Sequence, residues 1–297
     1  MPKLNPALLY LIIAAIIWGA TVPIMKIALR EIPIFSLAIL RMGIASILLL
    51  PFVYKDVKIQ RADIPLMLLV AFLGTNLNLT FFFFGVEHSP GINASAMTAI
   101  LPVLTLFLAH IYLKEKLSKK LLAGAVLALF GTLVIIGIPI FNLDLMSTLG
   151  SLSLLASTLA WVGYELISKK ALKKYKPLTV TFFTMALGAL FFIPAATSDL
   201  INFPNWYNHL SKEGVLGLLY GIIFASFVAY SFWQKGLAKT TAGQASFTFY
   251  LLPISGILFS FLLLGEKFTL FSIIGAAIIL AGVILGEYHR KSRQHTQ

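Results

Sequence analysis

The chain has no cysteine and carries little charge: charged residues make up 11% of its 297 residues, and hydrophobic residues make up 59%. The absence of cysteine excludes disulfides and thiolate metal sites, and it leaves the redox compartment open. Soluble domains usually carry about 25% charged residues, so this composition excludes an ordinary water-soluble fold. It indicates that most of the chain is surrounded by lipid.

The net charge of +12 comes from basic residues that lie between apolar runs. A nucleic-acid-binding surface would instead gather them on one face, so we expect no nucleic-acid partner. If the N-terminus is cytoplasmic, the joints on that side collect 18 of the 23 Lys and Arg residues, the outer joints collect 4, and Arg41 falls within a helix. The positive-inside rule then predicts that both termini are cytoplasmic.

Apolar runs long enough to cross the bilayer recur along the whole chain. A spanning helix needs roughly 20 mostly apolar residues. Such runs lie at approximately 7–28, 33–54, 64–84, 91–113, 119–138, 148–168, 178–197, 214–235, 242–264 and 269–287. The sequence therefore predicts an all-α membrane protein with ten transmembrane helices.

An internal repeat divides these helices into two sets. An offset of 151 residues superposes Gly85 on Gly236 and then holds without a gap for nearly fifty residues. The matched elements are Ala94-Ser95 with Ala245-Ser246, Leu101-Pro102 with Leu252-Pro253, Glu115-Lys116 with Glu266-Lys267, and Gly124-Ala125 with Gly275-Ala276. The first helices match at an offset of 143, which places Trp18 over Trp161.

Two units follow, residues 1–140 with helices one to five and residues 141–297 with helices six to ten and a short basic tail. Because five is odd, the second unit enters the membrane from the opposite side. Inverted repeats of this kind are the architecture of secondary transporters, in which a site between the halves is exposed alternately to each side.

Several motifs carry a resemblance to a known family. They are Trp18-Gly19-Ala20 in the first helix, Ala94-Ser95 leading to Leu101-Pro102 in the fourth, Glu115 and Glu266 after the fourth and ninth, and the glycine-rich fifth and tenth helices. In these features the chain resembles the EamA branch of the drug/metabolite transporter superfamily. The resemblance implies a ten-helix metabolite exporter of the inner membrane with a central cavity lined by both halves. In the superfamily's four-helix multidrug relatives the first helix carries a carboxylate where this chain has Trp18, which puts direct proton-for-cation exchange in doubt.

Polar residues within the bilayer are costly and point to function. Arg41 could anchor a substrate carboxylate, snorkel to the outer face or pair with Glu87. Asn76 and Asn78 lie two residues apart, so at most one of them can face a given cavity, and the other would bind a neighbouring helix. Ser95 and its repeat counterpart Ser246 suit a site between the halves.

Aromatic residues supply the other candidates. Trp18 and Trp161 lie inside predicted helices and either line a cavity or pack in the core. The predicted substrate-binding residues are Trp18, Arg41, Asn76, Asn78, Ser95, Trp161, Tyr164, Ser246 and Tyr250.

The acidic residues bear on the cargo. All eleven fall at or near the ends of the predicted helices or in joints, and only Glu87 and Glu165 are placed to reach inward. We therefore predict export of small neutral or zwitterionic metabolites, amino acids above all, with a cationic-drug exporter and a channel as alternatives. No catalytic constellation appears, so we expect neither an enzyme nor a cofactor, and we expect a monomer or a homodimer in the lipid bilayer.

Overall fold

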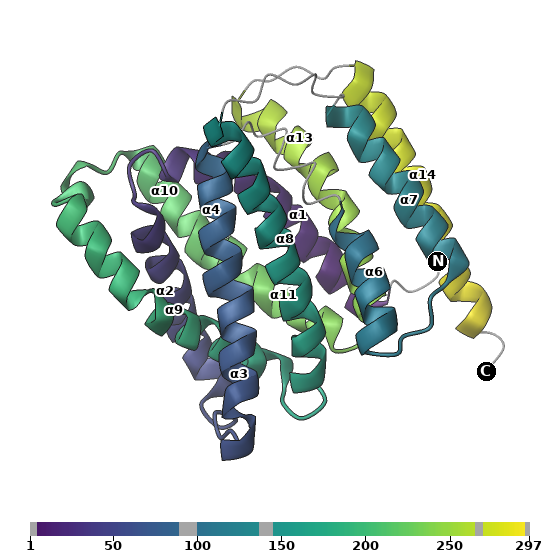
Figure 1. Ribbon diagram of the computed structural model, residues 1–297, viewed down its shortest axis with the longest axis horizontal. Coiled ribbons are helices and arrows are strands. Elements are labelled where there is room, and N and C mark those ends of the chain that lie inside the picture. The colour runs from purple at the N-terminus through teal and green to yellow at the C-terminus, as the bar shows by residue number, and fades with distance from the viewer. Residues whose placement is uncertain (1–4, 89–99, 137–144, 265–269, 295–297) are drawn as a thin grey trace.

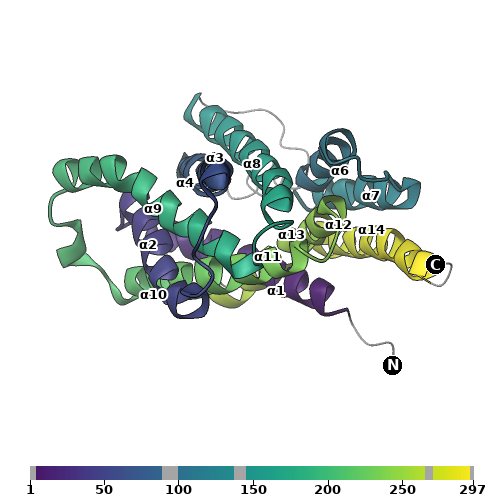
Figure 2. The ribbon, with the colours of Figure 1, turned by 90° about the horizontal axis from the view of Figure 1, so that it is seen from below.

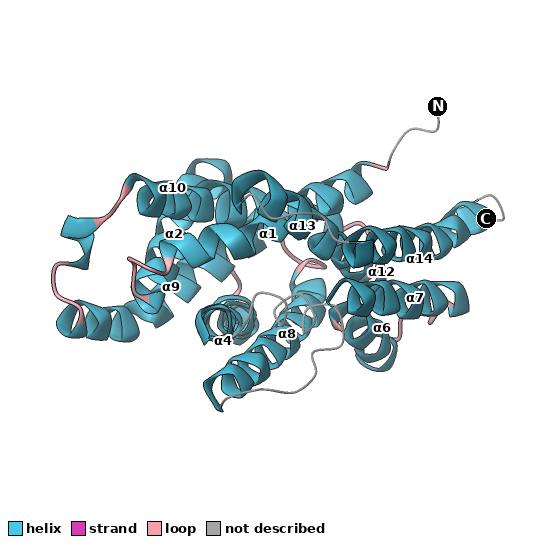
Figure 3. Ribbon diagram, turned by 90° about the horizontal axis from the view of Figure 1, so that it is seen from above, coloured by secondary structure: helices cyan, strands magenta, loops and turns pink. Residues whose placement is uncertain are grey.

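A computed structural model describes residues 5–88, 100–136, 145–264 and 270–294 (Figure 1). Within these ranges the chain forms helices joined by short loops, with no strand (Figure 3). The predicted all-α membrane fold is confirmed. Six of the described helices are long and apolar enough to cross a membrane.

The first half of the chain contributes α1 (Pro6–Ala28), α2 (Ile34–Val53), η1 (Arg61–Asp63), α3 (Ile64–Ala71), η2 (Phe72–Leu77), α4 (Asn78–His88), α6 (Leu101–Tyr112) and α7 (Lys119–Ile136). The second half contributes α8 (Leu145–Ala171), α9 (Pro177–Asn202), η3 (Trp206–His209), α10 (Lys212–Tyr220), η4 (Gly221–Val228), α11 (Ala229–Leu237), α12 (Ala242–Phe247), η5 (Thr248–Tyr250), α13 (Leu251–Leu264) and α14 (Leu270–Gln294).

The helix starts follow from local sequence. The Asn5 side chain accepts a hydrogen bond from the backbone N–H of Ala7, and Pro6 occupies the first helical position of α1, where a missing N–H costs nothing. Thr241 and Gln244 form a reciprocal capping box at α12. These caps fix where two of the helices begin.

Helices of the first half pack against helices of the second. α2 lies along α9, α4 along α8, and α1 along α11 and α13. α7 and α14 form a pair of their own at one edge of the molecule, far from α9 at the other edge (Figures 1 and 2). The core therefore lies between the two halves.

Three of the predicted continuous helices are interrupted. The run predicted at 64–84 contains the π-helical segment η2, and the run at 214–235 contains the π-helical segment η4. The run at 242–264 is broken by the 3-10 segment η5, which ends three residues before Pro253. Only α6 is described from the run predicted at 91–113. The predicted boundary at residue 140 lies outside the described ranges and stays a prediction.

Candidate functional site

Six aromatic side chains gather where the two halves meet. We call this cluster the aromatic cage, and its members are Trp18, Trp161, Tyr164, Tyr230, Trp233 and Phe249. The ring centroids of Trp18 and Trp161 lie 5.0 Å apart with nearly perpendicular planes. Trp18 stacks on Phe249 at 5.8 Å with an interplanar angle of 11°. The predicted pair of tryptophans thus meets inside the bundle, in a ring of aromatic faces.

The cage is built from four elements: α1, α8, α11 and η5. Trp161 and Tyr164 project from neighbouring positions of α8, and Tyr230 and Trp233 do the same on α11. Residues three apart on a helix share a face, so each helix presents two rings to the cage. Trp233, Tyr230 and Tyr164 are almost completely buried, and Trp18 is half-buried.

The two π-helical segments supply carbonyl groups to the cage. In η2, the backbone N–H of Asn78 bonds the carbonyls of Leu73 and Thr75, on either side of Gly74. The Gly74 carbonyl accepts a hydrogen bond from the Tyr230 hydroxyl at 3.0 Å. The shifted backbone pairing leaves the Gly74 carbonyl free to accept from Tyr230. π-turns are frequent at functional sites.

The second segment repeats this arrangement. In η4, the backbone N–H of Ala229 bonds the carbonyls of Phe224 and Ser226, on either side of Ala225. The Ala225 carbonyl accepts a hydrogen bond from Nε1 of Trp18 at 2.9 Å. Each half therefore offers one carbonyl to a cage residue that comes from the other half.

Five buried polar atoms in and beside the cage have no hydrogen-bond partner. They are Nε1 of Trp161, Nε1 of Trp233, Oε1 of Glu165, Oε1 of Gln234 and Oγ of Ser231. Buried polar groups are normally paired because leaving one unpaired costs about 1–3 kcal/mol. The set contains both donors and acceptors, so it could bind a group of either sign.

Glu165 lies deeper than the sequence indicated. It is wholly buried, and its Oε2 accepts a hydrogen bond from the Thr105 hydroxyl at 3.2 Å. The apolar run that placed Glu165 near a helix end stops at residue 168, whereas α8 continues to Ala171, about 9 Å beyond Glu165 along the helix axis. Glu165 stands one helical turn from Trp161 on the same face of α8.

Arg41 is also inside the bundle, with 2% of its surface exposed. Its Nε donates to the Gly221 carbonyl and to Oγ of Ser226, both at 3.3 Å, and its guanidinium lies 5.4 Å from the centre of the Phe83 ring. The predicted alternatives of snorkelling and of a pair with Glu87 are wrong, because Arg41 faces inward and Glu87 lies 3.7 Å from its own neighbour His88. No ion pair within the described part of the chain contains Arg41.

The other predicted site residues form their hydrogen bonds outside the cage. Nδ2 of Asn76 donates to the Gly188 carbonyl on α9, and Nδ2 of Asn78 donates to Ser157 on α8, so both asparagines bind neighbouring helices. The Ser246 hydroxyl donates to a carbonyl of its own turn. The Tyr250 hydroxyl donates to the Ala125 carbonyl on α7. Ser95 lies outside the described residues.

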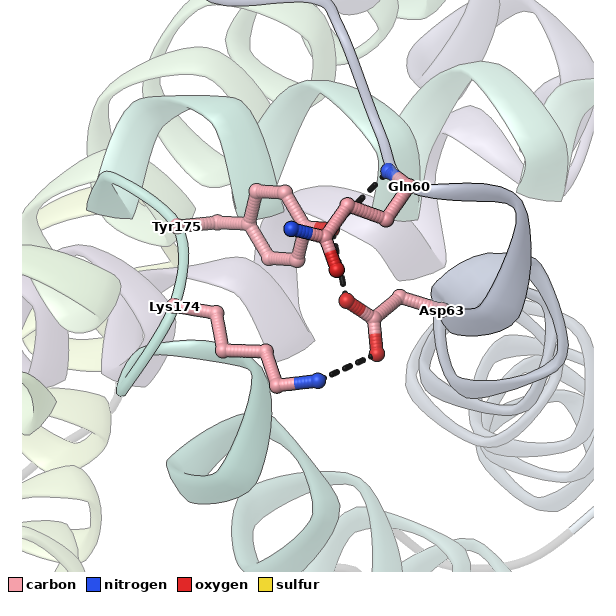
Figure 4. A network of polar contacts seen from close by, with 4 residues as sticks. All are labelled: Gln60, Asp63, Lys174 and Tyr175. Carbon is pink, nitrogen blue, oxygen red and sulfur yellow. Dashed lines mark hydrogen bonds and ion pairs between the residues drawn. The ribbon is translucent and has the colours of Figure 1, made fainter.

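Side-chain contacts close the end of the bundle at the joint between α8 and α9, which we call the basic end. Nζ of Lys174 and the hydroxyl of Tyr175 each lie 2.7 Å from the Asp63 carboxylate, and the Tyr175 hydroxyl accepts the backbone N–H of Gln60 (Figure 4). Figure 4 shows that this network joins the start of the η1–α3 helix to the second half.

Glu115 makes a second contact at the basic end. Its carboxylate accepts the backbone N–H groups of Ala242 at 2.8 Å and Gly243 at 3.2 Å, at the start of α12. A carboxylate at a helix N-terminus is favoured by the helix dipole. Glu115 of the predicted Glu-Lys pair thus links the first half to the second.

The opposite end has matching contacts between the halves. The Glu31 carboxylate accepts the hydroxyl of Ser211 at 2.6 Å and its backbone N–H at 2.8 Å, and Asp199 accepts the backbone N–H of Ser36 at 2.7 Å. These hydrogen bonds from Ser211 hold the pKa of Glu31 below its usual value of 4.5. Both ends of the described bundle are therefore joined by polar contacts between the halves.

We expect Glu31→Gln to lower the melting temperature of the purified protein at pH 7 by a few degrees at most, because the carboxylate is partly open to water. A lowered pKa means that the carboxylate stabilises the fold above pH 4.5 and loses this effect as the pH falls through its native pKa. The gap to wild type should close below pH 4.5 in thermal melts. Glu213→Gln, an exposed carboxylate on the same end, is the control, and a gap independent of pH would contradict the assignment.

Sequence reasoning missed Tyr230, Trp233 and Gln234, which stand together on α11. Gln234 donates to the Tyr164 hydroxyl at 2.6 Å and so ties α11 to α8. Among the described residues no group of three or more His, Asp or Glu side chains could hold a metal ion.

Comparison with known proteins agrees with this architecture. One family model, described as the EamA-like transporter family, matches the chain twice, over residues 5–137 and 148–286. The chain belongs to the EamA-like transporter family. The double match confirms the repeat, and this EamA-like protein is a multi-pass membrane transporter.

Curated relatives cover nearly the whole transporter. An uncharacterized transporter, YetK of Bacillus subtilis, is 26% identical over 94% of this chain and 86% of its own length. A probable terminal-alkyne amino-acid exporter of Streptantibioticus cattleyicolor is 26% identical over 95% of this chain and 94% of its own. A probable amino-acid metabolite efflux pump of Salmonella typhimurium is 25% identical over 95% of both chains.

A solved crystal structure shares the fold of this EamA-like transporter. It superposes with a TM-score of 0.78 at 19% sequence identity, and the match covers 95% of this chain and 97% of the other. The similarity extends through both halves.

Proposed function

We propose that this EamA-like transporter exports amino acids or similar zwitterionic metabolites across the inner membrane by alternating access, with the aromatic cage as the binding surface. The observation that carries the proposal is the set of unpartnered buried atoms around the cage. Indole N–H donors of Trp161 and Trp233 suit a carboxylate, and Oε1 of Glu165 suits an ammonium group. Two relatives whose names refer to amino acids support the choice.

The charged groups support a zwitterion as well. Glu165 is a buried carboxyl group, Arg41 is a buried guanidinium, and neither forms an ion pair within the described ranges. Burying an unpaired charge is expensive, and an amino acid brings one group of each sign. The aromatic faces of the cage add an apolar surface for its side chain.

Purified protein in liposomes tests the proposal. Labelled phenylalanine inside the vesicles should exchange with external phenylalanine faster than in empty vesicles, saturate with concentration and be competed by threonine. Uptake that does not saturate and shows no counterflow would favour the channel alternative.

A cation exporter is the second candidate, because a buried carboxyl group beside aromatic rings is also a chemistry that binds lipophilic cations. Tetraphenylphosphonium is a suitable probe. If it is carried while neither amino acid competes, and Glu165→Gln abolishes its transport, the cation function replaces ours.

Arg41 separates these two candidates. If it binds the substrate carboxylate, Arg41→Lys should weaken phenylalanine binding about tenfold, because lysine keeps the charge but loses the planar fork that holds a carboxylate. A cationic substrate has no carboxylate for Arg41 to bind, so its transport should not depend on the guanidinium fork. Unchanged phenylalanine affinity in both Arg41→Lys and Arg41→Gln, measured by ligand-induced stabilisation, would leave Arg41 a structural role alone.

A further inference from the structure

We infer that Trp161 stabilises a second conformation of the protein, in which its indole N–H donates to the Gly74 carbonyl. In the present conformation this carbonyl accepts from the Tyr230 hydroxyl. This inference rests on the alternating access of the proposed function, and it goes beyond it by naming the hydrogen bonds that are exchanged. It follows from the repeat and from which atoms are left unpaired.

The two acceptor carbonyls are equivalent by the repeat. The offset of 151 that relates the halves places Gly74 on Ala225, and it places the flanking N–H donor Asn78 on Ala229. The N–H groups of Asn78 in η2 and of Ala229 in η4 bond the carbonyls on either side of these two and not the two carbonyls themselves. Each therefore remains available to a side chain of the other half.

The two indole donors are also equivalent, but only one is used. Trp18 and Trp161 match at the offset of 143 for the first helices. Nε1 of Trp18 donates to the Ala225 carbonyl at 2.9 Å, whereas Nε1 of Trp161 is buried without a partner. The acceptor that symmetry assigns to Trp161 is the Gly74 carbonyl, and Tyr230 holds it.

Trp161 packs against the two tyrosines that contact Gly74. Its ring lies 5.7 Å from the ring of Tyr230, and 4.9 Å from the ring of Tyr164. Tyr164 packs against Gly74 so closely that a β-carbon on Gly74 would lie 2.3 Å from its ring. In the second conformation a change at these rings brings the Trp161 indole to the Gly74 carbonyl.

The inverted repeat relates this exchange of hydrogen bonds to the opening of one end of the transporter. In such transporters the two halves rock against each other around the site, so that one end opens at a time. Contacts between the halves join both ends here, and the second conformation breaks those of Glu115 and Asp63 at the basic end. In the conformation open at the basic end, Trp161 is bound to Gly74 and Trp18 has released Ala225.

A single cysteine reports this opening, because the native chain has none. Ser168 is wholly buried, one residue before Lys169 near the basic end. In the Ser168→Cys protein, the rate of alkylation by a soluble maleimide measures how often the basic end opens. No substrate is needed, so failure of the amino-acid proposal cannot disturb this measurement.

The variants are expected to act in opposite directions. Trp18→Phe removes a bond of the present conformation and should raise the labelling rate about five- to tenfold. Trp161→Phe removes a bond of the open conformation and should lower the rate by a similar factor. Trp206→Phe is the matched control: its N–H is also buried without a partner, but it lies on η3, outside the cage, so the rate should change less than about twofold.

Tyr230→Phe removes the present donor to Gly74 and loses only a hydroxyl group. It should raise the labelling rate about tenfold because the lost bond belongs to the present conformation. The rate of the protein that combines Tyr230→Phe with Trp161→Phe should lie between the rates of the two single variants. A rate that Trp161→Phe leaves unchanged or raises, or that Tyr230→Phe leaves unchanged or lowers, would overturn the inference even if phenylalanine is carried. If phenylalanine is not carried but the rates behave as stated, the inference stands and the cargo is wrong.

Discussion

Replacing Glu165 with glutamine should weaken phenylalanine binding about ten- to a hundredfold, the loss expected when a hydrogen bond to a charged group becomes one to a neutral amide. Glutamine has nearly the same shape, so it can still accept the Thr105 hydroxyl, and the fold should survive. The cost therefore falls on the substrate's ammonium group. Ligand-induced stabilisation of the purified protein and initial exchange rates in liposomes measure it.

Glu213→Gln is the control for this variant, because it removes the same charge from an exposed position at the start of α10. It should bind phenylalanine as wild type does. Equal affinity in Glu165→Gln and wild type would mean that the ammonium group binds elsewhere and that Glu165 only holds α6 to α8.

A side chain at Gly282 should separate the paired helices α7 and α14. A β-carbon on Gly282 would lie 2.7 Å from the carbonyl oxygen of Gly124 and 2.8 Å from the backbone nitrogen of Ala128. Neither backbone atom can move aside without shifting the whole helix. We expect Gly282→Ala to destabilise the protein by about 1–3 kcal/mol, typical of an overfilled contact, and Gly282→Leu to leave little folded protein.

Gly43→Ala is the matched control, because a β-carbon there would meet its nearest neighbour, Ala189, at 3.8 Å. Its melting temperature should equal or exceed that of wild type, since alanine favours a helix over glycine. If Gly282→Ala melts at the temperature of Gly43→Ala, the close approach of α7 and α14 is not needed for stability.

The helical membrane fold and the repeat could be predicted because they depend on properties that single residues carry. A bilayer selects apolar runs of a certain length, and the register of Gly85 with Gly236 survives in the residues themselves. The meeting of Trp18 with Trp161 also agrees with their matched positions. Such features need no knowledge of which side chains touch.

The π-helical segments could not be predicted, because their carbonyls are held by donors from distant helices, Trp18 and Tyr230. The cage residue Trp233 matches Phe82 in the repeat, a residue of another type, so the repeat does not indicate a role for Trp233. The sequence places Glu165 only by its distance from the end of an apolar run. Its burial depends on α6 and on the length of α8, which hydropathy does not define.

The pairing of α7 with α14 also has a consequence for biosynthesis. α7 enters the membrane early, but the helix that covers its small-residue face, with Ala125 and Ala128, is α14, which is made after all of α8 to α13. Until then this face must be covered by lipid or by another protein. A chain whose synthesis stops before α14 therefore keeps α7 without the helix that covers this face.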